Sequence, residues 1–240
     1  MGKGKFVPIV VLIVGALIVA GLFVFQKREA HYEAYIVGNL VALMFIPMLT
    51  ILGVFREEPS KFGFCLGDWS RIWVFVVACF VGLFGFLFLL KSCDLGIARE
   101  AWMGLRDYYP IFKRFPAEFG PAFRDYPRVS PWVSAPALML YAEATYGMYL
   151  FCWEFFFRGY LLSGLHRYMG WWAVIVQAIG FGLLHYGKVP AEFYVSFGAG
   201  IILGIIALKA KSFVPCFVLH WAASIGFDIM IIATRHTGMG

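Results

Sequence analysis

The sequence predicts an all-α protein, a polytopic membrane helix bundle with about seven to eight transmembrane helices. Of its 240 residues, 62% are hydrophobic and only 14% are charged, whereas soluble domains carry about 25% charged residues. The mean hydropathy is +0.80. The apolar runs are continuous and approach the ~20 residues that a helix needs to cross a bilayer. A transmembrane β-barrel would instead show shorter segments of alternating apolar and polar residues.

The amino-terminal half carries apolar segments that predict plain membrane anchors. Residues 6–26, 34–55 and 72–90 contain no charged residue. The first is longer than the apolar core of a signal peptide, so we expect it to remain as an uncleaved span. The stretch 91–131 is rich in Arg, Pro and aromatic residues, which suits a connector in the headgroup region. We therefore expect residues 1–131 to form N-terminal transmembrane helices and an interfacial loop.

The carboxyl-terminal half differs because each of its apolar segments carries an ionisable residue. These segments are residues 132–165, 171–185, 192–208 and 213–233. Ionisable side chains are costly within a membrane and usually serve a function there. The contrast with the first half predicts that residues 132–240 form a catalytic transmembrane helical core.

Two classes of function are disfavoured by composition. The net charge of +6 comes from basic residues scattered beside the spans, where they usually reflect membrane topology, so we expect no nucleic-acid partner. The five cysteines show no Cys-x-x-Cys spacing, which disfavours a thiolate metal site and a disulfide framework.

Glu154 and Arg158 form the most informative pair. They lie four residues apart in an aromatic run and therefore share one face of a helix. One interpretation is a structural ion pair, in which each charge needs the other. The other gives Glu154 a catalytic role, with Arg158 holding it in place. Glu143 lies eleven residues earlier on nearly the same helical face, and we interpret it as an ordinary residue near the helix end.

The remaining candidates lie on the later segments. His185 ends an apolar run, and Gly187 and Pro190 then interrupt the helix before Glu192. Glu192 would lie in the first turn of the next helix, where a carboxylate is also favoured as a simple cap, and His185 could be a packed core histidine. His220 is followed one turn later by Ser224, which could bond only to its own helix.

These residues resemble the motifs of the CPBP intramembrane proteases, a family that includes CAAX prenyl endopeptidases and bacteriocin-processing enzymes. That family carries Glu-Glu-x-x-x-Arg, then Phe-x-x-x-His, then His-x-x-x-Asn or Asp, on successive membrane helices. The matching positions here end in Arg158, His185 and Ser224. Two positions depart from the pattern: Trp153 replaces the first Glu, which the family uses to activate water, and Ser224 replaces Asn or Asp. The resemblance covers roughly the last 110 residues.

The resemblance implies an intramembrane endopeptidase of the glutamic type that hydrolyses a peptide bond near the membrane. Glu154 would take the proton from water unless Glu192 assumes that task, and Arg158 would hold the acid. His185 would protonate the leaving amine, and His220, helped by Ser224, would stabilise the oxyanion. We expect no cofactor, with a zinc protease as the rival within enzymes. The expected partners are a membrane-associated protein or peptide substrate and the lipid bilayer, in the plasma (inner) membrane of a prokaryote. The alternative is a non-enzymatic membrane protein, either a proton-coupled transporter or an inactive peptide-binding relative.

Overall fold

The computed structural model describes residues 3–92, 114–188 and 190–236, together with residues 96, 99, 100, 102, 103 and 112. The described part contains helices and no strand, which confirms the predicted all-α membrane bundle. Among the described residues, four helices are long and apolar enough to cross a membrane, namely Phe6–Arg28, Tyr32–Phe55, Glu192–Ala210 and Val214–Ala233. Two shorter apolar helices add to them, Trp73–Leu89 and Trp172–Leu183.

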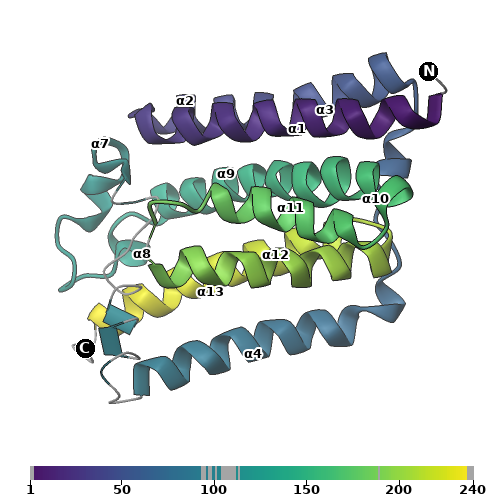
Figure 1. The fold of residues 1–240 in the computed structure, drawn as a ribbon. Helices are drawn as coiled ribbons and strands as arrows, with labels where there is room; N and C mark the ends of the chain where they lie inside the picture. Colours follow the sequence, from purple (N-terminus) through teal and green to yellow (C-terminus); the bar gives the residue numbers. More distant parts are fainter. Residues whose placement is uncertain are drawn as a thin grey trace.

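The amino-terminal half forms two long helices and a third that packs elsewhere in the bundle. Helix α1 spans Lys3–Arg28 and is followed by a nearly continuous helix built from α2 (Tyr32–Leu40), η1 (Val41–Phe45), α3 (Ile46–Leu49) and η2 (Thr50–Phe55). Short 3₁₀ turns, η3 (Pro59–Phe62) and η4 (Trp69–Arg71), lead to α4 (Trp73–Ser92). In Figure 1, α1 and α2 lie on one side of the bundle and α4 on the other.

The connector after α4 is described only from Arg114 onward and at a few earlier positions. It contains α7 (Pro116–Phe119), η5 (Gly120–Phe123) and α8 (Pro131–Ser134). Its aromatic side chains pack on the start of α2: the rings of Phe115 and Phe119 lie 5.3 Å and 4.8 Å from that of Tyr32. The connector is thereby fixed to the amino-terminal helices.

The carboxyl-terminal half supplies the centre of the bundle. It comprises α9 (Pro136–Glu154), η6 (Phe155–Ser163), α10 (Gly164–Met169), α11 (Trp172–Leu183), α12 (Pro190–Ala210) and α13 (Val214–His236). In Figure 1, α9 and α11 lie between the α1–α2 pair and α12–α13, and α4 packs on α13. A tight turn joins the last two helices, with Lys211 at a φ of 54°.

Close helix contacts set the register of this central group. A Cβ atom at Gly147 of α9 would lie 2.6 Å from the indole of Trp221 on α13. The same indole donates its Nε1–H to the carbonyl of Glu143 at 3.1 Å. Small residues likewise let α11 and α12 approach each other, because a Cβ at Gly200 would lie 3.0 Å from Ala178 and one at Gly182 would meet the ring of Phe197. These contacts fix α9 against α13 and α11 against α12.

Candidate active site

A buried ion pair lies at the end of α9. Glu154 is the last α-helical residue, and Arg158 follows in the π-helical stretch η6. Arg158 Nη1 lies 3.2 Å from Glu154 Oε1, and Arg158 Nε lies 3.2 Å from Oε2. Both side chains have zero relative exposure. A guanidinium and a carboxylate in such a place are ionised together, because either charge alone would be stranded away from water.

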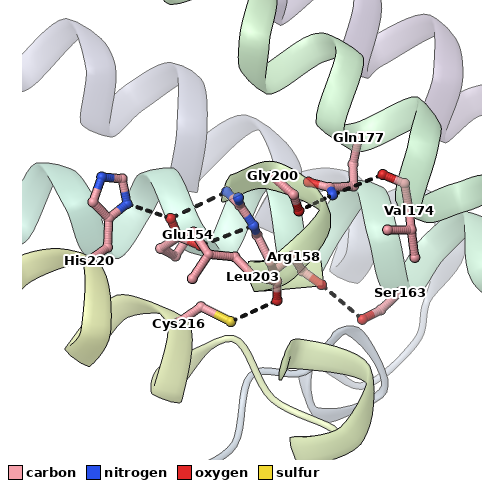
Figure 2. Close-up of polar contacts among 9 residues, drawn as sticks. All are labelled: Glu154, Arg158, Ser163, Val174, Gln177, Gly200, Leu203, Cys216 and His220. Carbon is pink, nitrogen blue, oxygen red and sulfur yellow. Dashed lines mark hydrogen bonds and ion pairs between the residues drawn. The ribbon is translucent and has the colours of Figure 1, made fainter. Parts of the chain in front are cut away.

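His220 of α13 completes this buried group, as Figure 2 shows. Its Nδ1 lies 2.7 Å from Glu154 Oε1. Since an ionised carboxylate only accepts, Nδ1 of His220 must donate, which leaves Nε2 as an acceptor in the neutral ring. The His220 side chain is 25% exposed although Glu154 is not. Glu154 therefore orients an imidazole whose other edge is accessible.

His185 and Glu192 form a second polar group at the break between α11 and α12. Helix α11 ends at Leu183, and Gly187 adopts a φ of 93° before α12 begins at Pro190. His185 Nδ1 lies 2.8 Å from the carbonyl oxygen of Phe181, so this nitrogen carries the proton. His185 Nε2 then faces Glu192 Oε1 at 3.9 Å. The same Glu192 oxygen accepts a hydrogen bond from Lys188 Nζ at 2.6 Å.

Phe181 joins the two groups. The guanidinium carbon of Arg158 lies 4.3 Å from the centre of its ring. The imidazole centroids of His185 and His220 lie 4.7 Å and 6.2 Å from the same ring. The sequence shows Phe181 only as the first residue of the Phe-x-x-x-His motif. Its contacts with Arg158, His185 and His220 arise from the packing of three helices.

Trp153 occupies the position of the missing acid. Its ring centroid lies 5.8 Å from Phe181 and 6.0 Å from His185, and its indole nitrogen is buried without a partner among the described residues. An indole cannot accept a proton from water as a carboxylate does. Its chemistry therefore differs from that of the first acid in the family pattern.

The structure brings together Glu154, Arg158, His185, Glu192 and His220 around Phe181, but it gives Ser224 no comparable place. Within the described part of the chain, the Ser224 hydroxyl forms no hydrogen bond.

Glu143 of α9 and Asp228 of α13 are neighbours. Both are buried, and their carboxyl groups lie close enough to interact. The expectation that Glu143 is an ordinary residue of the helix end is wrong as regards burial. The reason is that α9 and α13 run antiparallel, so that residues before Glu154 face residues after His220.

No group of three His, Cys, Asp or Glu side chains that could hold a metal ion occurs among the described residues. The two imidazoles do have the tautomers that metal ligands require, since each Nδ1 donates and each Nε2 is available. Glu192, however, is 3.9 Å from one Nε2 and the other imidazole belongs to the Glu154 group.

A pocket of about 470 Å³ borders the site. It is lined by Trp153, Leu184, Gly187 and Lys188 beside His185, and by residues near the end of α1 and the start of α2. The pocket therefore reaches Leu184 and Tyr186, the residues on either side of His185.

Residues 135–226 match the family model described as Type II CAAX prenyl endopeptidase Rce1-like. This is the Rce1-like segment of the chain. It contains every candidate residue named above, and the match confirms the resemblance drawn from the three motifs. No curated protein and no solved structure matches the chain. The apolar helices indicate an integral membrane protein, and residues 135–226 are similar to the Rce1-like family of CAAX-type proteases.

Proposed function

We propose that this protein is an endopeptidase that hydrolyses a peptide bond near the membrane surface in a protein or peptide tail, using water activated by Glu192 and His185. The observation that carries this proposal is the approach of Glu192 to the free edge of His185, beside a second imidazole anchored by a carboxylate. An acid and two oriented histidines around the Phe181 ring are the groups that acyl transfer to water requires.

Glu192 suits the role of general base better than Glu154. The oxygens of Glu154 are engaged by Arg158 and His220 inside a fully buried pair. A water molecule would have to displace one of these charged partners to reach them. Glu192 also has a charged partner, Lys188 at 2.6 Å from its Oε1. Its side chain is nevertheless 27% exposed and faces His185, so water reaches it without entering a fully buried ion pair. Glu154 then positions His220, and Arg158 neutralises the negative charge of the Glu154 carboxylate.

The reaction follows from these positions. Glu192 takes a proton from water as the oxygen attacks the substrate carbonyl. His220, protonated at both ring nitrogens for this step, donates Nε2–H to the carbonyl oxygen as negative charge develops on it. The proton then passes through His185 to the leaving nitrogen as the C–N bond breaks. The distance of 3.9 Å between His185 and Glu192 must shorten by about 1 Å for a direct hydrogen bond, as catalytic contacts commonly do when substrate binds.

We further propose that residues 132–240 form the catalytic core, and that the amino-terminal helices also shape its entrance. The polar groups of the site all come from α9–α13. Residues near the end of α1 and the start of α2 nevertheless line the pocket beside His185. The first half of the chain thereby has a part in substrate access beyond anchoring.

The test is cleavage of a library of synthetic peptides with apolar tails by the purified protein in lipid nanodiscs, with products identified by mass spectrometry. Glu192→Gln, His185→Ala and His220→Ala should each lower the cleavage rate by about 10²- to 10⁴-fold. Glu33→Gln, an exposed acid at the start of α2, is the matched control and should cleave as wild type does. If Glu192→Gln and His185→Ala both retain full activity, the assignment fails.

A further inference from the structure

The pocket beside His185 has an unbalanced charge. Among the described residues that line it, four carry cationic side chains, Lys27, Arg28, Arg114 and Lys188, and one carries a carboxylate, Glu29. Glu29 Oε1 already accepts two backbone N–H groups, from residues 30 and 31, at 3.0 Å and 2.9 Å. The electrostatic potential in the pocket is therefore positive, which favours an anionic occupant.

Two of these cations rest on aromatic rings. Lys27 Nζ lies 3.8 Å from the ring centre of Phe23, and the guanidinium carbon of Arg114 lies 4.5 Å from that of Tyr35. Within the described ranges, neither cation has a carboxylate within 4.0 Å. Cation–π contacts hold such side chains in place but leave their N–H groups available. Both residues can thus donate charge-assisted hydrogen bonds to a ligand without breaking an existing ion pair.

The pocket is continuous with the proposed catalytic group through two of its lining residues. Trp153 contacts the ring of His185. Lys188 lines the pocket and also donates to Glu192 at 2.6 Å. A group bound here would therefore lie next to the reacting atoms, and it would compete with Glu192 for Lys188.

We propose that this pocket binds a carboxylate of the substrate, so that the preferred substrates carry an anionic group close to the scissile bond. That the bound carboxylate belongs to a substrate rests on the proposed function. Binding of the carboxylate draws Lys188 away from Glu192, because one ammonium group is then shared by two anions. The carboxylate of Glu192 becomes free to accept a proton when substrate is present.

The experiment measures binding separately from cleavage. A fluorescently labelled apolar octapeptide is prepared with a free carboxyl terminus, with an amidated terminus, and with an amidated terminus preceded by Asp. Each is titrated into His185→Ala protein in phosphatidylcholine nanodiscs. We expect amidation to weaken binding by about 3- to 10-fold, as for charge-assisted hydrogen bonds in a partly exposed pocket. Recovery of affinity by the Asp peptide would assign recognition to any carboxylate, and lack of recovery to the chain terminus.

Variants then locate the effect. Arg114→Gln and Lys27→Gln should each remove most of the preference for the charged peptide, whereas Lys61→Gln, an exposed lysine in the turn η3, should leave it unchanged. Glu192→Gln should strengthen binding of the charged peptide by about 2- to 5-fold, because it releases Lys188 from a charged competitor. A merely structural role for the pocket would not produce this gain.

Three results would overturn the proposal: equal binding of charged and amidated peptides, no change of preference in Arg114→Gln and Lys27→Gln, or loss of the preference when phosphatidylglycerol is added to the nanodiscs. The last would assign the pocket to a lipid headgroup. Cleavage of amidated peptides as readily as charged ones would leave the proposed function standing and sink this inference alone. Carboxylate-selective binding by a wild-type protein that cleaves nothing would do the reverse.

Discussion

The buried pair of Glu154 and Arg158 should show strong energetic coupling, which can be measured by a double-mutant cycle. Replacing Glu154 by Leu leaves a guanidinium of zero exposure without its anion, and replacing Arg158 by Leu strands the carboxylate in the same way. Breaking a buried pair from one side costs about 3–5 kcal/mol. The 4.3 Å contact between Arg158 and the ring of Phe181 recovers only about 1–2 kcal/mol. Each single variant should therefore lose about 3 kcal/mol or more.

The double variant, with Leu at both positions, should be more stable than either single variant because no unpaired charge remains. A coupling energy of about 2–4 kcal/mol between the two sites is expected. The assay is reversible unfolding of the purified protein in mixed micelles, followed by near-UV circular dichroism. Single-variant losses below about 1 kcal/mol, or simple additivity of the two, would show that water reaches the pair and would refute the argument from burial.

Three other predictions follow from the helix contacts and the site. Gly147→Leu should destabilise the protein by about 1–3 kcal/mol by driving into Trp221, while Gly53→Ala, where nothing lies within 4 Å, should change stability by less than about 1 kcal/mol; equal effects in unfolding experiments would contradict the register of α9 against α13. Ser224→Ala should slow peptide cleavage by less than about tenfold, in contrast to His220→Ala, because its hydroxyl bonds to no described residue. Cleavage should persist after exhaustive dialysis against 1,10-phenanthroline, and its loss together with restoration by zinc would favour the metal mechanism.

The fold class and the helical segments could be predicted because they depend on local composition. A window without charge predicts a span whatever its neighbours are, and residues such as Gly187 and Pro190 end a helix through their own backbone preferences. The helix start before Glu192 was predicted on the same basis. Each of these features is encoded within a few residues of where it appears.

The arrangement of the site depended on contacts between distant segments, which the sequence indicated only through the family motifs. Motif order could suggest that Glu154 and His220 belong together, but not that Glu154 is enclosed while Glu192 is accessible. The π-helical stretch η6, the ring contacts of Phe181 and the pairing of Glu143 with Asp228 arise from the packing of one helix against another. They could not be predicted from periodicity within any one segment.

Helices α11 and α12 approach closely at Gly182 and Gly200. The relative position of the proposed base and its histidine partner therefore depends on how these two helices pack. In the usual family pattern the catalytic acid precedes Glu154, so that acid and arginine belong to one helix and keep a fixed separation. Here the proposed base, Glu192, lies in the first turn of α12, whereas His185 follows the end of α11. A change that separates α11 from α12 would therefore displace the proposed base from its histidine without altering either residue.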